Sequence, residues 1–203
     1  MIKPRVRIIE AIPSGTRKGK GQDAPILGEL LKMAGMLPKI KDVTSKDADN
    51  EWLAFVDALQ CKERWVHISS HGDGDNLYIG KSEVDFSKSD LWAFDDPKPL
   101  RQKLISLSAC GRVGGTFAKT LNNLGAAAVV RPLATVSFTE SAVFFAMFYF
   151  SLLKQSPDER NTSSRLAQYI DCFGRVNSSY RGIGGTGAFR LDYWWRGDHV
   201  YLH

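Results

Sequence analysis

The chain has 203 residues, of which 43% are hydrophobic and 24% are charged, and its formal net charge is +5. This length favours one full hydrophobic core over two, so we expect a single domain over residues 1–203. The three cysteines have neither paired nor metal-type spacing, which argues against a disulfide framework and a zinc site.

Membrane insertion and secretion are not indicated by the sequence. The basic N-terminus lacks the apolar segment of a signal peptide. The longest uncharged apolar stretch, 141–153, has 13 residues, well below the roughly 20 that a membrane-spanning helix needs. We therefore expect a cytoplasmic protein with no membrane partner.

The positive charge is concentrated near the N-terminus. Residues 1–50 carry ten Lys/Arg against six Asp/Glu, which leaves +4, and the remainder carries seventeen against sixteen, which leaves +1. Arg17, Lys18 and Lys20 lie in a Gly-rich loop, where a solvated surface is favoured over a nucleic-acid site. We treat nucleic acid as an unlikely partner.

Apolar periodicity predicts alternating strands and helices. In chain order we expect a strand at 5–12, a helix at 26–37 stopped by Pro38, a strand at 40–43, a helix at 47–60 and a strand at 65–70. This β-α-β-α-β order predicts a parallel sheet with right-handed crossovers.

The rest of the chain is also predicted to alternate between strands and helices. We expect a small strand at 77–79, a helical turn at 86–94, a strand at 104–109, a helix at 116–124, a strand at 126–130, a buried helix at 141–153, a helix at 163–173, and an edge strand or hairpin within 189–202.

Two of these strands end in side chains that carry chemistry. Cys110 follows the strand at 104–109, and His71 follows the strand at 65–70. The carboxyl ends of neighbouring parallel strands meet at one sheet edge, where a nearby imidazole favours the thiolate form of a cysteine. The amides of Gly72 and Cys110 are candidate donors to an oxyanion. From these residues alone, a buried packing cysteine and a structural histidine remain the alternative.

Three stretches together resemble the CHAT domain of the caspase-like cysteine peptidases. They are VHISSHGDGDNLYIG, LISLSACGRVGGTFAKTLNNLGAAAVV and the aromatic helix that contains Phe148, and they span residues 65–153 in matching order. The resemblance implies a caspase-like three-layer α/β/α sandwich with a mostly parallel central sheet. It also implies that His71 is the catalytic histidine, Cys110 the nucleophile and Gly72 an oxyanion donor, and that the chemistry needs no metal or organic cofactor.

Substrate selectivity is where the chain departs from better-known relatives. Two residues before the cysteine, metacaspases carry Asp and caspases carry Gln, whereas this chain has Ser108. We retain Ser108 as a substrate-binding candidate, with Asp73 or Asp75 as an alternative source of negative charge. The preferred residue on the amino side of the cleaved bond, P1, stays open.

The resemblance predicts a cysteine endopeptidase that cleaves a protein substrate. Bacterial members of the family act in defence and regulated cell death, including cleavage that activates a pore-forming effector. Because the chain is too short to hold a sensor domain as well, we expect control in trans by a regulatory protein. The alternative is a catalytically silent module that binds a protein or nucleic acid.

Other motifs predict little chemistry. Gly80, Lys81 and Ser82 resemble the end of a phosphate-binding loop, but Gly74 lies one residue too far upstream. The glycine-rich run 182–187 follows a helical region and precedes a strand, which is the wrong context for a dinucleotide fold. We expect His67 in the core and Cys61 and Cys172 as packing residues.

Overall fold

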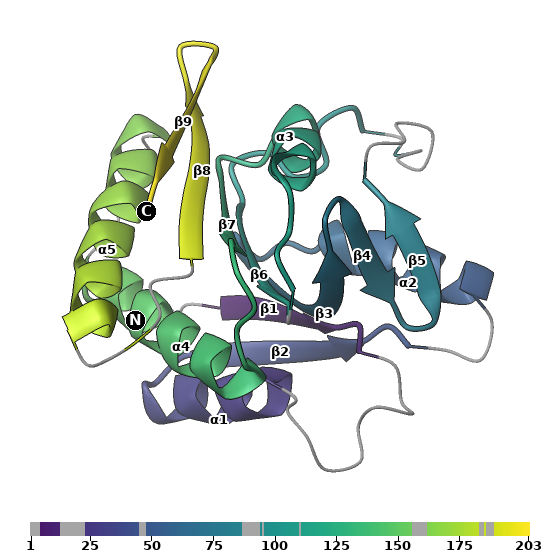
Figure 1. Cartoon of the computed structure of the whole chain (residues 1–203), viewed down its shortest axis with the longest axis horizontal. Coiled ribbons are helices and arrows are strands. Elements are labelled where there is room, and N and C mark those ends of the chain that lie inside the picture. The colour runs from purple at the N-terminus through teal and green to yellow at the C-terminus, as the bar shows by residue number, and fades with distance from the viewer. Residues whose placement is uncertain are drawn as a thin grey trace.

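A mixed, mostly parallel sheet forms the centre of the chain (Figure 1). The computed structural model describes residues 5–12, 23–44, 48–86, 94, 96–109, 111–155, 162–182, 185 and 189–203. The strands within this part are β1 (Arg5–Glu10), β2 (Leu37–Asp42), β3 (Trp65–Asp73), β4 (Asn76–Ile79), β5 (Ser82–Asp85), β6 (Leu104–Ala109), β7 (Ala128–Pro132), β8 (Phe189–Trp195) and β9 (Asp198–Leu202). The helices are α1 (Asp23–Met33), α2 (Ala48–Leu59), α3 (Gly115–Asn123), α4 (Phe138–Lys154) and α5 (Thr162–Gly182).

The strand order is β2-β1-β3-β6-β7-β8-β9. The first five strands of this row pair in parallel, and the β8–β9 hairpin is added antiparallel to β7. A second hairpin, β4–β5, pairs with the end of β3. Every residue of β6 and β7 is buried, as expected of central strands that are covered on both faces.

Helices cover both faces of the sheet. Side chains of α1, α4 and α5 form a hydrophobic cluster on one face, and side chains of α2 and α3 form a second cluster on the other. The chain is therefore an α/β protein with a mostly parallel central sheet, as the alternating pattern predicts.

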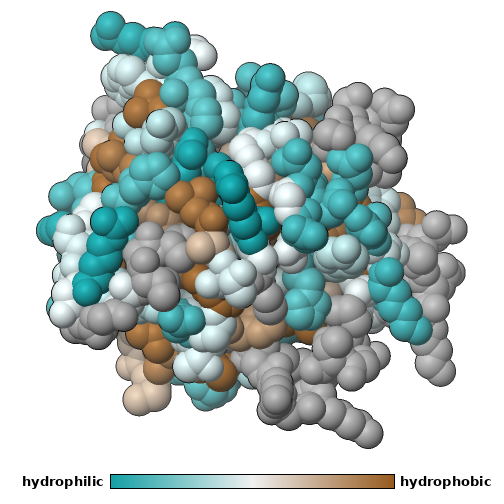
Figure 2. Space-filling view, viewed as in Figure 1, coloured by the Kyte–Doolittle hydropathy of each residue, from teal (hydrophilic) through white to brown (hydrophobic). Residues whose placement is uncertain are grey.

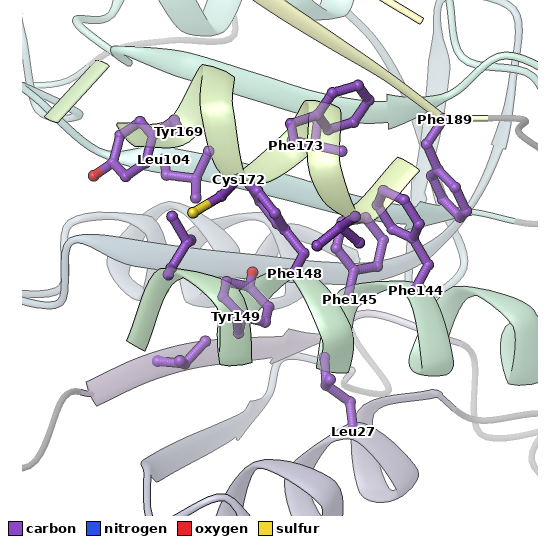
Figure 3. Packing of buried hydrophobic residues seen from close by; sticks show 14 of the residues in the cluster. Leu27, Leu104, Phe144, Phe145, Phe148, Tyr149, Tyr169, Cys172, Phe173 and Phe189 are labelled. Atoms are coloured by element: carbon purple, nitrogen blue, oxygen red, sulfur yellow. The ribbon is translucent and has the colours of Figure 1, made fainter. Parts of the chain in front are cut away.

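The aromatic side of α4 fills the larger cluster (Figure 3). The Phe144 ring stacks on that of Phe189 from β8 at 4.1 Å between centroids and meets the edges of Phe173 and Tyr180 from α5. The helix begins with a capping box, in which Ser137 and Glu140 satisfy each other's backbone amides. Its position against β8 and α5 is thus fixed along its length.

Some predicted boundaries are wrong. The first helix ends at Met33 rather than at Pro38, because the chain reverses through Gly35 at φ 82° and Pro38 lies inside β2. Proline is tolerated there because β2 is an edge strand. The helix expected at 163–173 extends to Gly182, β3 continues through His71 to Asp73, and β5 was not expected. Most of the helical turn expected at 86–94 lies outside the described residues.

Among the described helices, none is both long and apolar enough to span a membrane. The face in Figure 2 is a mixed surface on which hydrophobic side chains form small patches between hydrophilic ones.

We expect Phe144→Ala to lower the free energy of unfolding by about 3–5 kcal/mol, because it removes a fully buried ring that five aromatic partners surround. The matched control is Phe150→Ala on the same helix, where the ring is 41% exposed. The control should cost less than about 1 kcal/mol in chemical denaturation. Equal losses in both variants would contradict this account of the core.

Candidate functional site

The strands that carry His71 and precede Cys110 are direct neighbours in the sheet. β3 and β6 pair in parallel, with Ser69 opposite Ser108 and Ser70 opposite Ala109. His71 is the next residue of β3 after Ser70. It pairs with Tyr78 of β4. Cys110 itself lies outside the described residues, but Ala109 and Gly111 on either side are described. The predicted adjacency of the two strands is therefore confirmed.

Backbone hydrogen bonds join the segments that follow these strands. The amide of Gly74 donates to the carbonyl of Arg112 at 2.9 Å, and the amide of Gly114 donates to the carbonyl of Gly74 at 2.6 Å. Gly74 and Val113 form a parallel bridge. We call this contact between residues 72–74 and 111–114 the loop junction. It holds the segment after His71 against the segment after Cys110.

The loop junction requires close backbone approach. A Cβ atom on Gly72 would lie 2.7 Å from Val113 Cγ2 and 3.3 Å from the Ala109 Cβ, and a Cβ atom on Gly111 would collide with the carbonyl oxygen of Gly72. Side chains at positions 72 and 111 would therefore push the two segments apart.

His71 is half-buried beneath an aromatic ring. The ring of Phe138, at the start of α4, packs against the imidazole with 5.6 Å between centroids in an edge-on geometry. Burial disfavours the charged imidazolium and lowers the pKa of His71 from its ordinary value of 6.5. The neutral ring, which can accept a proton from a thiol, is thus the main form at neutral pH.

Ser108 points into the core. Its side chain is fully buried, and its hydroxyl lies 3.1 Å from Nε2 of His67. On the other side of that ring, Nδ1 lies 3.5 Å from the hydroxyl of Tyr149 on α4. His67 is therefore a core histidine, as predicted, and Ser108 is its hydrogen-bonding partner.

The two aspartates after His71 differ in their surroundings. Asp73 is exposed at the end of β3. The carboxylate of Asp75 lies beside the backbone of Gly114, where a Cβ atom would collide with it. The Asp75 carboxylate thus packs against the loop junction, whereas Asp73 lies within it and is exposed.

Glu10 is a buried acid that the sequence analysis did not single out. It ends β1, is 5% exposed and accepts hydrogen bonds from the Ile12 amide at 3.1 Å and the Ser69 hydroxyl at 3.4 Å. The sheet register places it beside Ser69, which lies beside Ser108. The available signal was an acidic residue inside the otherwise apolar stretch IIEAI.

Other candidate regions lack comparable chemistry. A cavity of about 390 Å³ lies at the opposite sheet edge, where Gln102 leads into β6 and Ala127 into β7; its lining also includes Lys98, Arg101, Asn122, Gly125 and Ala126, with neither histidine nor cysteine. No cluster of metal-ligating side chains occurs among the described residues. The basic loop with Arg17, Lys18 and Lys20, and most of the run 182–187, lie outside that part.

Taken together, these groups suit acyl transfer by a thiol. A half-buried imidazole that is mainly neutral at neutral pH lies on β3, the strand next to the one that Cys110 follows, and the glycine backbone at position 72 is partly exposed. A base beside a thiol and a close backbone amide are what a cysteine nucleophile needs.

We expect Gly72→Ala to lower the free energy of unfolding by about 1–3 kcal/mol, because its Cβ would overlap Val113. In chemical denaturation, the double variant Gly72→Ala/Val113→Ala should lose less stability than the sum of the two single variants. Gly174→Ala on α5, where nothing lies within 4 Å of the added carbon, is the control and should not destabilise. Strict additivity would mean that the two residues do not touch.

Removing the ring over His71 should raise the pKa of His71. In NMR titrations, the wild-type value should lie below 6.5 and should move toward 6.5 in Phe138→Ala, because water then reaches the imidazole. Phe150→Ala should leave the pKa of His71 unchanged. Since the unfolded chain takes up this proton first as pH falls through 6.5, the wild-type protein should lose stability on acidification in that range. If the pKa of His71 were the same in Phe138→Ala as in wild type, the Phe138 ring would not be what desolvates the imidazole.

No family model matches the chain, and no curated protein shows significant similarity to it.

Proposed function

We propose that the chain is a cysteine endopeptidase in which Cys110 is the nucleophile and His71 the general base and acid. The observation that supports this best is the loop junction, in which the segment after His71 is hydrogen-bonded to the segment after Cys110. Two strands can be adjacent without their ends serving one site. Here the backbone contacts continue beyond both strand ends.

The proposed reaction proceeds through an acyl-enzyme. His71 takes the proton of the Cys110 thiol, and the sulfur attacks the peptide carbonyl to form an S–C bond. The tetrahedral oxyanion receives hydrogen bonds from backbone amides, for which Gly72 and Cys110 are the candidates. His71 then returns the proton to the departing amine as the C–N bond breaks, and water hydrolyses the thioester.

The resemblance to CHAT-type and other caspase-like peptidases supports this assignment. An α/β chain with helices on both faces of a mostly parallel sheet suits a caspase-like three-layer sandwich. The order of the segments that resemble the family is the order in which β3, β4, β6, α3, β7 and α4 occur. That the chain has the caspase-like fold in particular is part of the proposal.

We infer that P1 is not acidic. The register of β1, β3 and β6 places Glu10, Ser69 and Ser108 side by side. Ser69 precedes His71 by two residues, and Ser108 likewise precedes Cys110. The Glu10 carboxyl accepts hydrogen bonds from the Ile12 amide and the Ser69 hydroxyl, which hold it in this row. An ionised Glu10 at this level would disfavour an acidic side chain next to the cleaved bond, because like charges repel in a poorly solvated site.

The proposed setting is cytoplasmic and regulated. By resemblance, the substrate is a protein such as a pore-forming effector in bacterial defence or regulated cell death, and a regulatory protein controls cleavage in trans. Such control predicts weak peptidase activity for the isolated chain.

The direct test combines thiol modification with peptide hydrolysis. Intact mass should show one adduct that forms faster at neutral pH than an ordinary thiol would, is absent in Cys110→Ala and forms more slowly in His71→Ala, since an imidazole that accepts the thiol proton favours the thiolate. Hydrolysis of a peptide panel with arginine, leucine or aspartate at P1 should fall by about 10²–10⁴ in either variant and be weakest for aspartate. Cys61→Ala is the matched control and should keep both activities.

Ordinary thiol reactivity of Cys110, together with equal hydrolysis by wild type and Cys110→Ala, would contradict the peptidase. The alternative function, a catalytically silent module that binds a protein or nucleic acid, would then be favoured. Salt-sensitive nucleic-acid binding that is lost on substitution of Arg17, Lys18 and Lys20 would point to that module.

A further inference from the structure

A buried ion pair lies on the α3 face of the sheet, outside the proposed dyad. Nε of Arg131 on β7 lies 2.7 Å from Oδ2 of Asp192 on β8, and the two side chains are 3% and 0% exposed. Two charges in the interior lose their hydration, and their attraction offsets this loss only where further hydrogen bonds complete the site. The remaining contacts of both side chains therefore show how this site is completed.

Asp192 has three cationic or potentially cationic partners. Besides Arg131, its Oδ1 atom lies 2.9 Å from Nε of Arg190 on the same strand and 2.8 Å from Nε2 of His199 on β9. The Asp192 carboxylate thus keeps two partners if Arg131 is replaced. Joining β7 to the β8–β9 hairpin does not depend on Arg131 alone.

Arg131 makes one contact that the other partners of Asp192 do not make. Its Nη1 donates a hydrogen bond to the carbonyl of Val113, in the loop junction. The Val113 amide donates to the carbonyl of Pro132 at 3.3 Å, so both sides of this residue are bound to the end of β7. Val113 also bridges to Gly74 and is 1% exposed.

We propose that Arg131 is a positioning residue that holds the loop junction in register, and that Asp192 orients its guanidinium for this task. This inference rests on the proposed peptidase function. The planar guanidinium has separate donors for the carboxylate and for the carbonyl, which a lysine ammonium cannot reproduce in the same geometry. Arg131 thereby ties residues 111–114, directly after Cys110, to the rigid end of β7.

A purely structural role would make Arg131 one of several bonds between β7 and β8. Arg190 distinguishes the two roles, because it also pairs with Asp192 but makes no hydrogen bond or ion pair with the loop junction among the described residues; its guanidinium instead lies 3.7 Å from the ring centre of Tyr201 on β9. Arg190→Met is therefore the matched control for Arg131→Met. Arg131→Lys is the second variant, because it keeps the buried positive charge if the methionine variant fails to fold.

The experiment measures two properties of each folded variant, with folding checked by thermal unfolding. One is the pH profile of Cys110 alkylation by iodoacetamide, which reports the thiolate. The other is hydrogen exchange at the amides of Gly74 and Gly114, whose acceptors lie across the loop junction. For Arg131→Met and Arg131→Lys we expect about tenfold faster exchange at both amides and about tenfold slower alkylation at neutral pH, with a profile shifted toward an ordinary thiol. Arg190→Met should stay within about twofold of wild type in both measurements.

Faster exchange with an unchanged alkylation profile would overturn the positioning role, and so would equal effects of Arg131→Met and Arg190→Met. Unchanged exchange in both Arg131 variants would show that Arg131 does not hold the loop junction. If the wild-type thiol proves ordinary and wild type hydrolyses peptides no faster than Cys110→Ala, the proposed function fails, and the exchange measurement alone then decides whether Arg131 holds residues 111–114 in place.

Discussion

The close approach of two backbone segments, residues 72–74 and 111–114, is the constraint on which the rest of the site depends. Parallel pairing brings β3 and β6 together only as far as Ser70 and Ala109. Beyond that point the chains could diverge, because β3 goes on to pair with β4 while the chain after β6 turns toward α3. The hydrogen bonds of Gly74 and Gly114 prevent this. Glycine is needed at positions 72 and 111 because a side chain there would occupy the space of the opposite segment.

The site draws support from both faces of the sheet. Phe138 covers His71 from the side of α4, whereas Ala109 and Val113 belong to the cluster that α2 and α3 form on the other face. Arg131, which pairs with Asp192, reaches the loop junction from the same side as α3. A change in the packing of either core would therefore alter the distance between the two strand ends, which is why a dense core on each face matters to a small site at the edge.

Local patterns predicted the elements well, and contacts distant in sequence account for what they missed. Apolar periodicity correctly predicted the strand at 104–109 and helices close to α2, α3 and α4. The apolar pattern of each of these elements lies within the element itself. The extension of β3 through His71 depends on pairing with β4, and the tolerance of Pro38 depends on β2 being an edge strand. Glu10 bonds to Ser69, and Arg131 to Asp192, across 59 and 61 residues. No local window contains both members of such a pair.

The polar groups beneath the dyad also limit what can select a substrate. If the resemblance to caspase-like peptidases holds, Ser108 takes the place of a longer polar side chain, but its hydroxyl bonds to His67 inside the core. The hydroxyl therefore has a partner without a substrate, and a substrate that competed for it would leave His67 with one hydrogen-bonding neighbour fewer. Glu10 differs because it brings a carboxylate to the same row of side chains from a separate strand. In the proposed peptidase, charge selectivity at this edge would then come from β1 rather than from β6, the strand that precedes Cys110.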